Sequence, residues 1–144
     1  MAARQVEGIN AVTDRETTPI LEQRLNMPKI ERLGMAARYS EVAICNGVAY
    51  LAGQVPETTL EQDIEAQTRE VLQLIDQLLA QAGSDKSRIL MCQIFIADLA
   101  DFAGMNRVWD AWVVPGHAPP RATVEAKLAN AAYRLEIVIT ASQA

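Results

Sequence analysis

Apolar residues recur at helical spacing in two stretches of the chain. Between Leu60 and Ala82 they fall on one side of a helix, and Gly83 follows at a position suited to end it. The stretch 98–114 repeats the pattern, with Asp98 placed to cap the first turn. These patterns predict two amphipathic helices, each of which buries one side.

Other apolar positions indicate strands. The stretches 40–45 and 48–55 flank Asn46-Gly47, and this dipeptide is the strongest short signal for a tight hairpin. The run 87–98 is almost continuously apolar and rich in isoleucine, which is typical of a buried central strand. Two further short strands are expected within 118–139, after a break at Gly116 to Pro120.

The expected order of elements from Lys29 onward is β-β-β-α-β-α-β-β. This order predicts an α+β fold with one sheet of about six strands and both helices on one face. Two helices can cover only one face of such a sheet, so the other face is either solvated or covered by another subunit. Because the second face mixes polar and apolar positions, we expect a homo-oligomer with a pocket at a wet interface.

Each of the last two expected strands carries a charge where an apolar residue is usual. Arg121 and Thr123 share one face of the first, and Glu136 and Val138 share one face of the second. Arginine offers a planar fork that binds a carboxylate, and a nearby glutamate can hold and activate a water. The pair could therefore form a small hydrolytic site without a metal. A plain salt bridge between neighbouring strands is the alternative.

Composition excludes several classes of function. The chain has 144 residues, of which 50% are hydrophobic and 22% charged, as in one ordinary globular domain. The net charge of −5 argues against a nucleic-acid surface. A single histidine and the absence of a Cys/His cluster disfavour a zinc site, and no apolar run is long enough for a membrane span. Cys45 and Cys92 lie in strand-like contexts and are expected to be free thiols, which fits a cytoplasmic protein.

The first 26 residues differ in character from the remainder. They are polar and lack strand periodicity, although one short helix is expected, with Thr18 as its N-cap and Pro19 at its first position. We therefore predict an N-terminal extension over 1–26 and a compact domain over 27–144.

Three segments resemble the RidA (YjgF) family of enamine/imine deaminases. "PPRATVEAKLANAAYRLEI" is similar to the family's signature, "YSEVAICNGVAYLAGQVP" to its N-terminal hairpin, and "DLADFAGMNRVWDAWV" to its second helix. The stretch "DFAGMNRVWDAWVVPGHAPPR" looks most like the YoaB branch. The resemblance implies a chorismate-mutase-like homotrimer with clefts between subunits. It also implies hydrolysis of 2-iminocarboxylates to 2-oxo acids and ammonia without a cofactor, and a small 2-imino or 2-oxo acid as the partner, with no nucleic acid and no membrane.

The resemblance also assigns residues to the site. The signature arginine, which holds the substrate carboxylate, falls on Arg121, and the glutamate that positions the water falls on Glu136. Tyr39 takes the place of a tyrosine that lines the pocket, and Asn106 that of an asparagine near the interface. Gly53 and Thr123 are expected to offer backbone contacts. On this basis we expect Arg121 and Glu136 on adjacent strands, with their shared face lining an intersubunit cleft.

Two positions depart from the pattern of active members. Ala52 stands where a serine is common, and Thr123 stands where cysteine is frequent. A lost serine hydroxyl removes one hydrogen bond, worth about 0.5–1.5 kcal/mol. These departures motivate a second hypothesis, a trimeric protein that binds small carboxylates without catalysis. A third, endoribonuclease activity, is disfavoured by the acidic charge. Trp109 and Trp112 are expected to serve packing or a subunit interface, and ligand stacking is the alternative.

Overall fold

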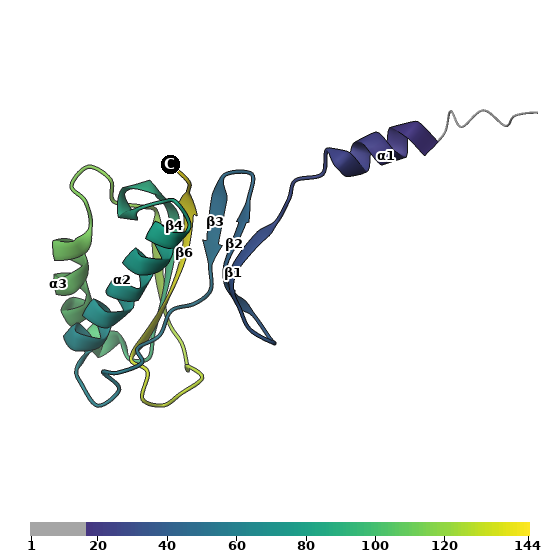
Figure 1. Cartoon of the computed structure of the whole chain (residues 1–144). Coiled ribbons are helices and arrows are strands. Elements are labelled where there is room, and N and C mark those ends of the chain that lie inside the picture. The colour runs from purple at the N-terminus through teal and green to yellow at the C-terminus, as the bar shows by residue number, and fades with distance from the viewer. Residues whose placement is uncertain (1–16) are drawn as a thin grey trace, which may run out of the picture.

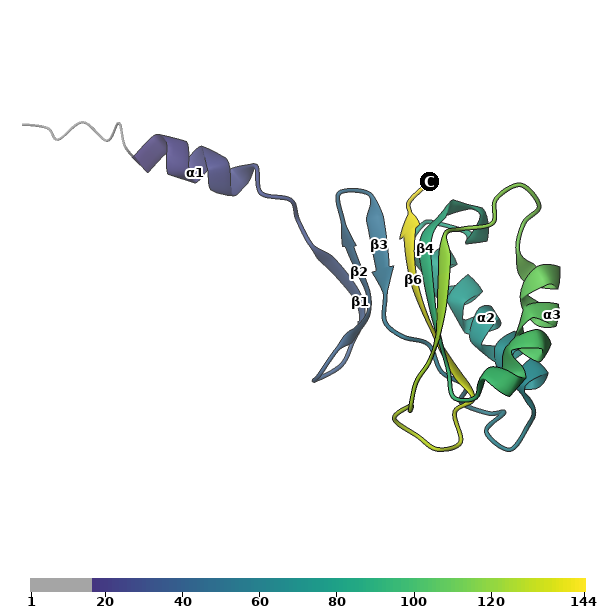
Figure 2. The same ribbon diagram turned by 180° about the vertical axis from the view of Figure 1, so that it is seen from behind.

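The computed structural model describes residues 17–144. The predicted N-terminal helix is present as α1 (Thr17–Leu25), and it extends away from the sheet beyond β1 (Glu31–Met35), as Figures 1 and 2 show. The start of the predicted extension, residues 1–16, lies outside the described residues, and its boundary at residue 26 stays a prediction.

The predicted hairpin is confirmed. β2 (Ser40–Cys45) and β3 (Val48–Leu51) pair antiparallel around Asn46 and Gly47. These two residues have φ angles of 51° and 74°. Positive φ at both central positions defines the turn whose twist matches that of the flanking strands, and glycine and asparagine adopt it at little cost.

The first predicted helix is α2 (Ile64–Gln81), and it begins later than the pattern suggested. Asp63 caps it by accepting a 2.9 Å hydrogen bond from the backbone N–H of Ala66. At the other end Gly83 has a φ of 73°, as expected of a glycine that ends a helix. The apolar spacing therefore located the helix, while the capping side chain set its first residue.

The second predicted helix is α3 (Phe102–Trp112), which follows β4 (Ile89–Ile96). Asp98 does act as a cap, but it caps a short 3-10 turn, Leu99–Asp101, through a 2.9 Å hydrogen bond from the N–H of Ala100. The α-helix proper begins only after that turn.

The chain ends with β5 (Arg121–Glu125) and β6 (Leu135–Ser142). Within residues 17–144, six strands form one sheet in the order β1-β2-β3-β6-β4-β5. β4 and β5 are parallel and joined through α3, which is the usual helical crossover between parallel strands. Because β4 pairs with both of them, β5 and β6 are not adjacent, and the expectation that Arg121 and Glu136 lie on adjacent strands is wrong.

Both α2 and α3 cover the same face of the sheet (Figures 1 and 2), so the expected two-layer α+β architecture is confirmed. The core lies between the helices and this face, and it is built from aliphatic side chains and a few others. Its largest fully buried members are Leu72, Ile75, Leu79, Ile94, Ile96, Met105, Leu135, Ile137 and Ile139.

No helix covers the opposite face of the sheet, which we call the open face, within the described part of the chain. Several of its apolar side chains are strongly exposed. Tyr50 is 51% exposed and Val124 48%, and their strand partners Thr140 and Phe95 place them on this face. A small hollow of about 140 Å³ lies between Phe95, Ala122 and Val124. The open face thus has the character of a surface that associates with another.

Candidate functional site

Arg121, the first residue of β5, lies on the face of the sheet that the helices cover. In the parallel register it stands opposite Cys92, whose side chain is fully buried beneath the helices. Its Nη1 donates a 2.9 Å hydrogen bond to Oδ1 of Asn106 on α3. Its guanidinium carbon also lies 5.1 Å from the ring centre of Trp109 and 5.9 Å from that of Phe102. Asn106 and Arg121, two of the predicted site residues, are therefore in direct contact.

The Arg121 guanidinium has no acidic partner among the residues that the structure describes. Thr123, two positions further along β5, lies on the same face of the sheet as Arg121. The Oγ1 of Thr123 is buried without a hydrogen-bond partner within residues 17–144. A buried polar atom without a partner is costly and rare, so this hydroxyl is a candidate ligand contact. Arg121, Asn106 and Thr123 are called the Arg121 cluster below.

Cys92 lies beside this cluster, and its thiol is not a candidate nucleophile. Burial raises the pKa of Cys92 to about 12, against a smaller opposing effect of the Arg121 charge. The thiol therefore stays protonated at neutral pH, and a protonated thiol is a poor nucleophile.

Glu136 occupies the open face, beside the chain segment that follows β3. Gln54 in that segment bridges to Ile137, with its N–H 2.8 Å from the Ile137 carbonyl and the return hydrogen bond at 3.0 Å. This bridge brings Gly53 against Glu136. A Cβ on Gly53 would lie 2.9 Å from Cδ of Glu136 and would collide with its carboxylate. A side chain at position 53 would therefore require the Glu136 carboxylate to move.

Tyr39 and Gly53 line one cavity of about 310 Å³, together with Glu41 and Gln54. The Tyr39 side chain is 57% exposed. Oε2 of Glu41 accepts a 3.0 Å hydrogen bond from Nε2 of Gln54, which holds the Gly53 segment from the β2 side. Glu41 was not among the predicted site residues, although it follows Tyr39 and Ser40 in the sequence. Tyr39, Gly53 and Glu136 are called the Glu136 cluster below.

The two clusters do not meet within one chain. Arg121 is opposite Cys92 on the covered face, whereas Glu136 is opposite Phe95, whose other partner on the open face is Val124. The expectation of a shared face is therefore wrong as well. The pattern correctly grouped Arg121 with Thr123, but the parallel pairing of β5 with β4 turned this group toward the helices.

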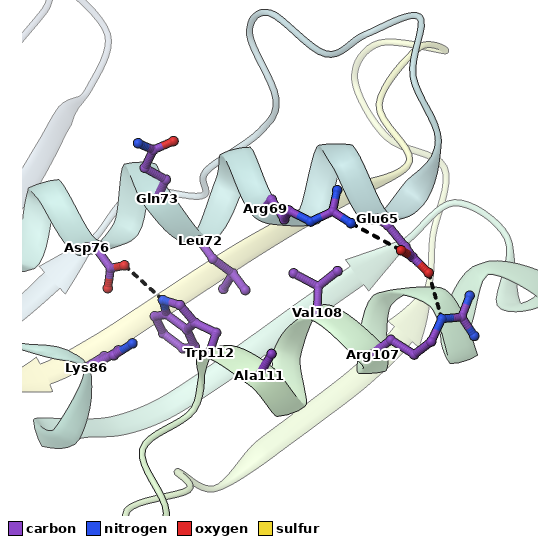
Figure 3. Close-up of a pocket in the computed structure, with 10 residues that line it drawn as sticks. All are labelled: Glu65, Arg69, Leu72, Gln73, Asp76, Lys86, Arg107, Val108, Ala111 and Trp112. Carbon is purple, nitrogen blue, oxygen red and sulfur yellow. Dashed lines mark hydrogen bonds and ion pairs between the residues drawn. The ribbon is translucent and has the colours of Figure 1, made fainter.

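A larger hollow of about 520 Å³ lies between α2 and α3, and three of its charged side chains pair with one another (Figure 3). The Glu65 carboxylate accepts a hydrogen bond from Arg107 Nε at 2.6 Å and another from Arg69 Nη2 at 3.2 Å. At the other end, Asp76 accepts a 3.0 Å hydrogen bond from the indole N–H of Trp112, over which Lys86 lies. We call this hollow the α2–α3 groove. It contains no predicted site residue, and the Glu65–Arg107 and Asp76–Trp112 contacts link the two helices.

These features define a class of protein: a small α+β domain with an open sheet face and two incomplete clusters of polar residues. Residues 29–143 match the model of the Endoribonuclease L-PSP family, and the chain belongs to this family. No helix among residues 17–144 is long and apolar enough to cross a membrane.

Individual relatives agree with this assignment. The chain is 50% identical over 113 residues to the RutC family protein YoaB of Escherichia coli, covering 78% of this chain and 97% of YoaB. A crystal structure of a YjgF protein family member from Neisseria meningitidis superposes with a TM-score of 0.78 at 46% identity, covering 81% and 96% of the two chains.

A more distant relative bears a functional name. The chloroplastic Reactive Intermediate Deaminase A of Arabidopsis thaliana is 33% identical over 109 residues, covering 71% of this chain and 58% of that protein. The resemblance to the RidA (YjgF) family and to YoaB is thereby confirmed, and membership supports a deaminase-like role at the level of the family.

Proposed function

We propose that the protein is a homotrimeric enamine/imine deaminase that hydrolyses 2-iminocarboxylates to 2-oxo acids and ammonia. Arg121 binds the substrate carboxylate, and Glu136 positions the attacking water. Tyr39, Gly53, Asn106 and Thr123 complete the pocket, and neither a metal nor a cofactor takes part. The cytoplasm remains the expected location, since Cys45 and Cys92 are both free thiols.

The observation that carries this proposal is the Arg121 guanidinium, which has no carboxylate partner among the described residues. Asn106 engages only one of its nitrogens, and the neighbouring rings of Phe102 and Trp109 accept no second strong hydrogen bond. An arginine that is held in place but not neutralised can bind an incoming carboxylate through its remaining donors.

The reaction follows from these two groups. Glu136 accepts a proton from water as the water oxygen attacks the imine carbon, and the C=N double bond becomes a single bond. The proton passes to the nitrogen and gives an aminoalcohol. Glu136 then transfers the hydroxyl proton to the amino group, the carbon–nitrogen bond breaks, and ammonia leaves as the carbonyl forms. Because Arg121 fixes the adjacent carboxylate, the imine carbon is held in one position relative to the water.

The oligomer is needed because of the strand order. Arg121 and Glu136 lie on opposite faces with β4 between their strands, so one chain alone cannot bring them to one substrate. An interface between copies can place the Arg121 cluster of one subunit against the Glu136 cluster of the next. The exposed apolar side chains of the open face, such as Tyr50 and Val124, support such an association.

A coupled assay tests the activity. An amino-acid oxidase generates imines from several amino acids, and ammonia release is followed with wild type, Glu136→Gln and the control Glu65→Gln, whose carboxylate lies in the α2–α3 groove. We expect wild type and Glu65→Gln to accelerate release and Glu136→Gln to lose the effect. If wild type accelerates none of the imines, the deaminase proposal is refuted.

A mixing experiment tests the shared site. Arg121→Ala and Glu136→Gln are each expected to be inactive, and they are unfolded and refolded together so that subunits exchange. If each site takes one residue from each of two subunits, about one quarter of the sites in a random equal mixture regain both groups. If the mixture stays inactive, the two residues do not serve one site across an interface.

Two rival functions predict results that differ from those of a deaminase. Ala52 and Thr123 favour a binding protein without catalysis, which predicts calorimetric binding of 2-oxo acids without turnover of any imine. The description of the matched family names an endoribonuclease. RNA cleavage that survives stringent purification in both Arg121→Ala and Glu136→Gln would favour that activity, although the net charge of −5 opposes binding of a polyanion.

A further inference from the structure

Phe102, Asn106 and Trp109 form one stripe along α3, and this stripe faces Arg121. Their spacing places them successively on one side of a helix. All three contact the guanidinium: Asn106 through a 2.9 Å hydrogen bond, Trp109 at 5.1 Å and Phe102 at 5.9 Å from guanidinium carbon to ring centre. Three side chains of one helix thus contact the end of the Arg121 side chain.

The members of the stripe differ in burial. Trp109 is only 5% exposed and belongs to the core cluster, so its ring is fixed by packing. Phe102 is 38% exposed and lies nearer the surface. The guanidinium therefore rests over one immobile ring and beside one accessible ring.

The position of Arg121 on an edge strand leaves its side chain free to move unless other groups hold it. β5 is the last strand of the sheet, so Arg121 has a neighbouring strand on one side only. A long arginine side chain at such an edge can adopt many rotamers, and ordering it on binding would cost free energy. Rings over the face of a guanidinium attract the cation and leave its N–H groups, which lie in the guanidinium plane, for other acceptors.

We propose that Trp109 is a positioning residue for carboxylate capture: it fixes the plane of the Arg121 guanidinium before the substrate arrives, with Phe102 as a weaker second support. This inference rests on the proposed role of Arg121 as the carboxylate-binding group. It assigns to Trp109 a function beyond core packing, and it does not require Trp109 to touch the substrate.

The test compares two ligands of the same shape in calorimetric titrations: 2-oxobutanoate and its uncharged amide, 2-oxobutanamide. The dissociation constant of the amide divided by that of the acid measures how well the protein recognises the carboxylate. We expect Trp109→Leu to reduce this ratio about tenfold, since it removes the closer cation–π contact, and Trp109→Phe to restore most of it. Trp112→Phe, which alters the other tryptophan of α3, should leave the ratio unchanged.

Three results would overturn the inference. The first is an unchanged ratio in Trp109→Leu, and the second is an equal loss of affinity for acid and amide, which indicates only structural damage. The third is a wild type that binds both ligands equally or not at all. Should Trp109→Leu fail to fold, Phe102→Leu at the surface serves instead, with an expected reduction of about threefold. Because the readout is binding, a preference for the acid that falls in Trp109→Leu would support this inference even if the wild type released no ammonia and the deaminase were refuted.

Discussion

Helix α3 carries one arginine, Arg107, and lies beside another, Arg121, and the two have contrasting surroundings. On the side of α3 toward α2, Arg107 forms an ion pair with Glu65 in the α2–α3 groove, whereas on the side toward β5, Arg121 contacts an amide and two rings. The groove is the larger hollow, about 520 Å³ against about 310 Å³ for the cavity beside Tyr39. The comparison teaches that unsatisfied binding capacity, and not the size of a hollow, distinguishes a candidate site from a structural link between helices.

The largest expected difference comes from removing each arginine in turn. Arg121→Ala should abolish imine turnover, since loss of a charged contact to a bound carboxylate costs about 2–5 kcal/mol. Arg107→Ala should keep activity within about twofold, because an exposed ion pair contributes about 0–1 kcal/mol to stability. Steady-state ammonia release measures both variants, and size-exclusion chromatography checks that the oligomer persists. Comparable losses of activity in the two variants would contradict the contrast between the arginines.

The next effect concerns Gly53. In Gly53→Ala the new methyl group collides with the Glu136 carboxylate, so the carboxylate must leave its position. We expect turnover to fall by about tenfold or more, because small displacements of a reacting group are costly. The midpoint of thermal unfolding should stay close to that of wild type, because the displaced carboxylate is not part of the core. A variant with full activity would show that the observed position of Glu136 is not the one used in the reaction.

Removing the carboxylate from the α2–α3 groove should affect stability more than activity. Glu65→Gln breaks its ion pairs with both Arg69 and Arg107. Since both arginine side chains are more than 60% exposed, at 61% and 66%, the loss should be below about 1 kcal/mol in the free energy of unfolding. Urea denaturation measures this loss. A strong decrease in turnover by the same variant would instead mark the groove as part of the site.

The last effect concerns stability alone and is a pH dependence near the Tyr39 cavity. Glu70 on α2 binds the loop that follows this cavity, accepting hydrogen bonds from Thr59, Thr58 and the backbone of Glu57. Burial opposes ionisation, but these hydrogen bonds outweigh it and lower the pKa of Glu70 from 4.5 to about 2. The carboxylate therefore stabilises the fold above pH 4.5, and this contribution is lost as the pH falls from there toward 2.

Denaturant midpoints between pH 6 and pH 3 test this. We expect the midpoint of Glu70→Gln to decline less over this interval than that of wild type. Parallel curves for the two proteins would mean that Glu70 has the same pKa in the folded and unfolded states.

Sequence patterns predicted the local structure well and the pairing of distant strands poorly. Helical spacing located α2 and α3, and Asn46-Gly47 located the hairpin, because these signals depend only on neighbouring residues. The alternation along β5 showed that Arg121 and Thr123 share a face, but it could not show which face of the sheet this is. That depends on the register with Cys92 and Ile94, which is set through the α3 crossover.

The same limit applies to the candidate site. The signature segment pointed to Arg121 and Glu136, but the contact of Glu136 with Gly53 joins residues 83 positions apart (136 minus 53) and leaves no local signal. Phe102 and Trp109 were visible at helical spacing, and aromatic residues at that spacing ordinarily indicate packing. Only their contacts with Arg121 in the structure distinguish Phe102 and Trp109 from ordinary packing residues.

The connections around the two clusters also imply an order of folding. The β4–β5 pair that presents Arg121 joins Cys92 to Arg121, 29 positions apart (121 minus 92), with α3 forming in between. The bridge that positions Glu136 joins Gln54 to Ile137, 83 positions apart (137 minus 54). Closing a longer loop costs more chain entropy, and distant contacts slow folding. We therefore expect the Arg121 cluster to form early within its own β-α-β unit, and the Glu136 cluster to form last.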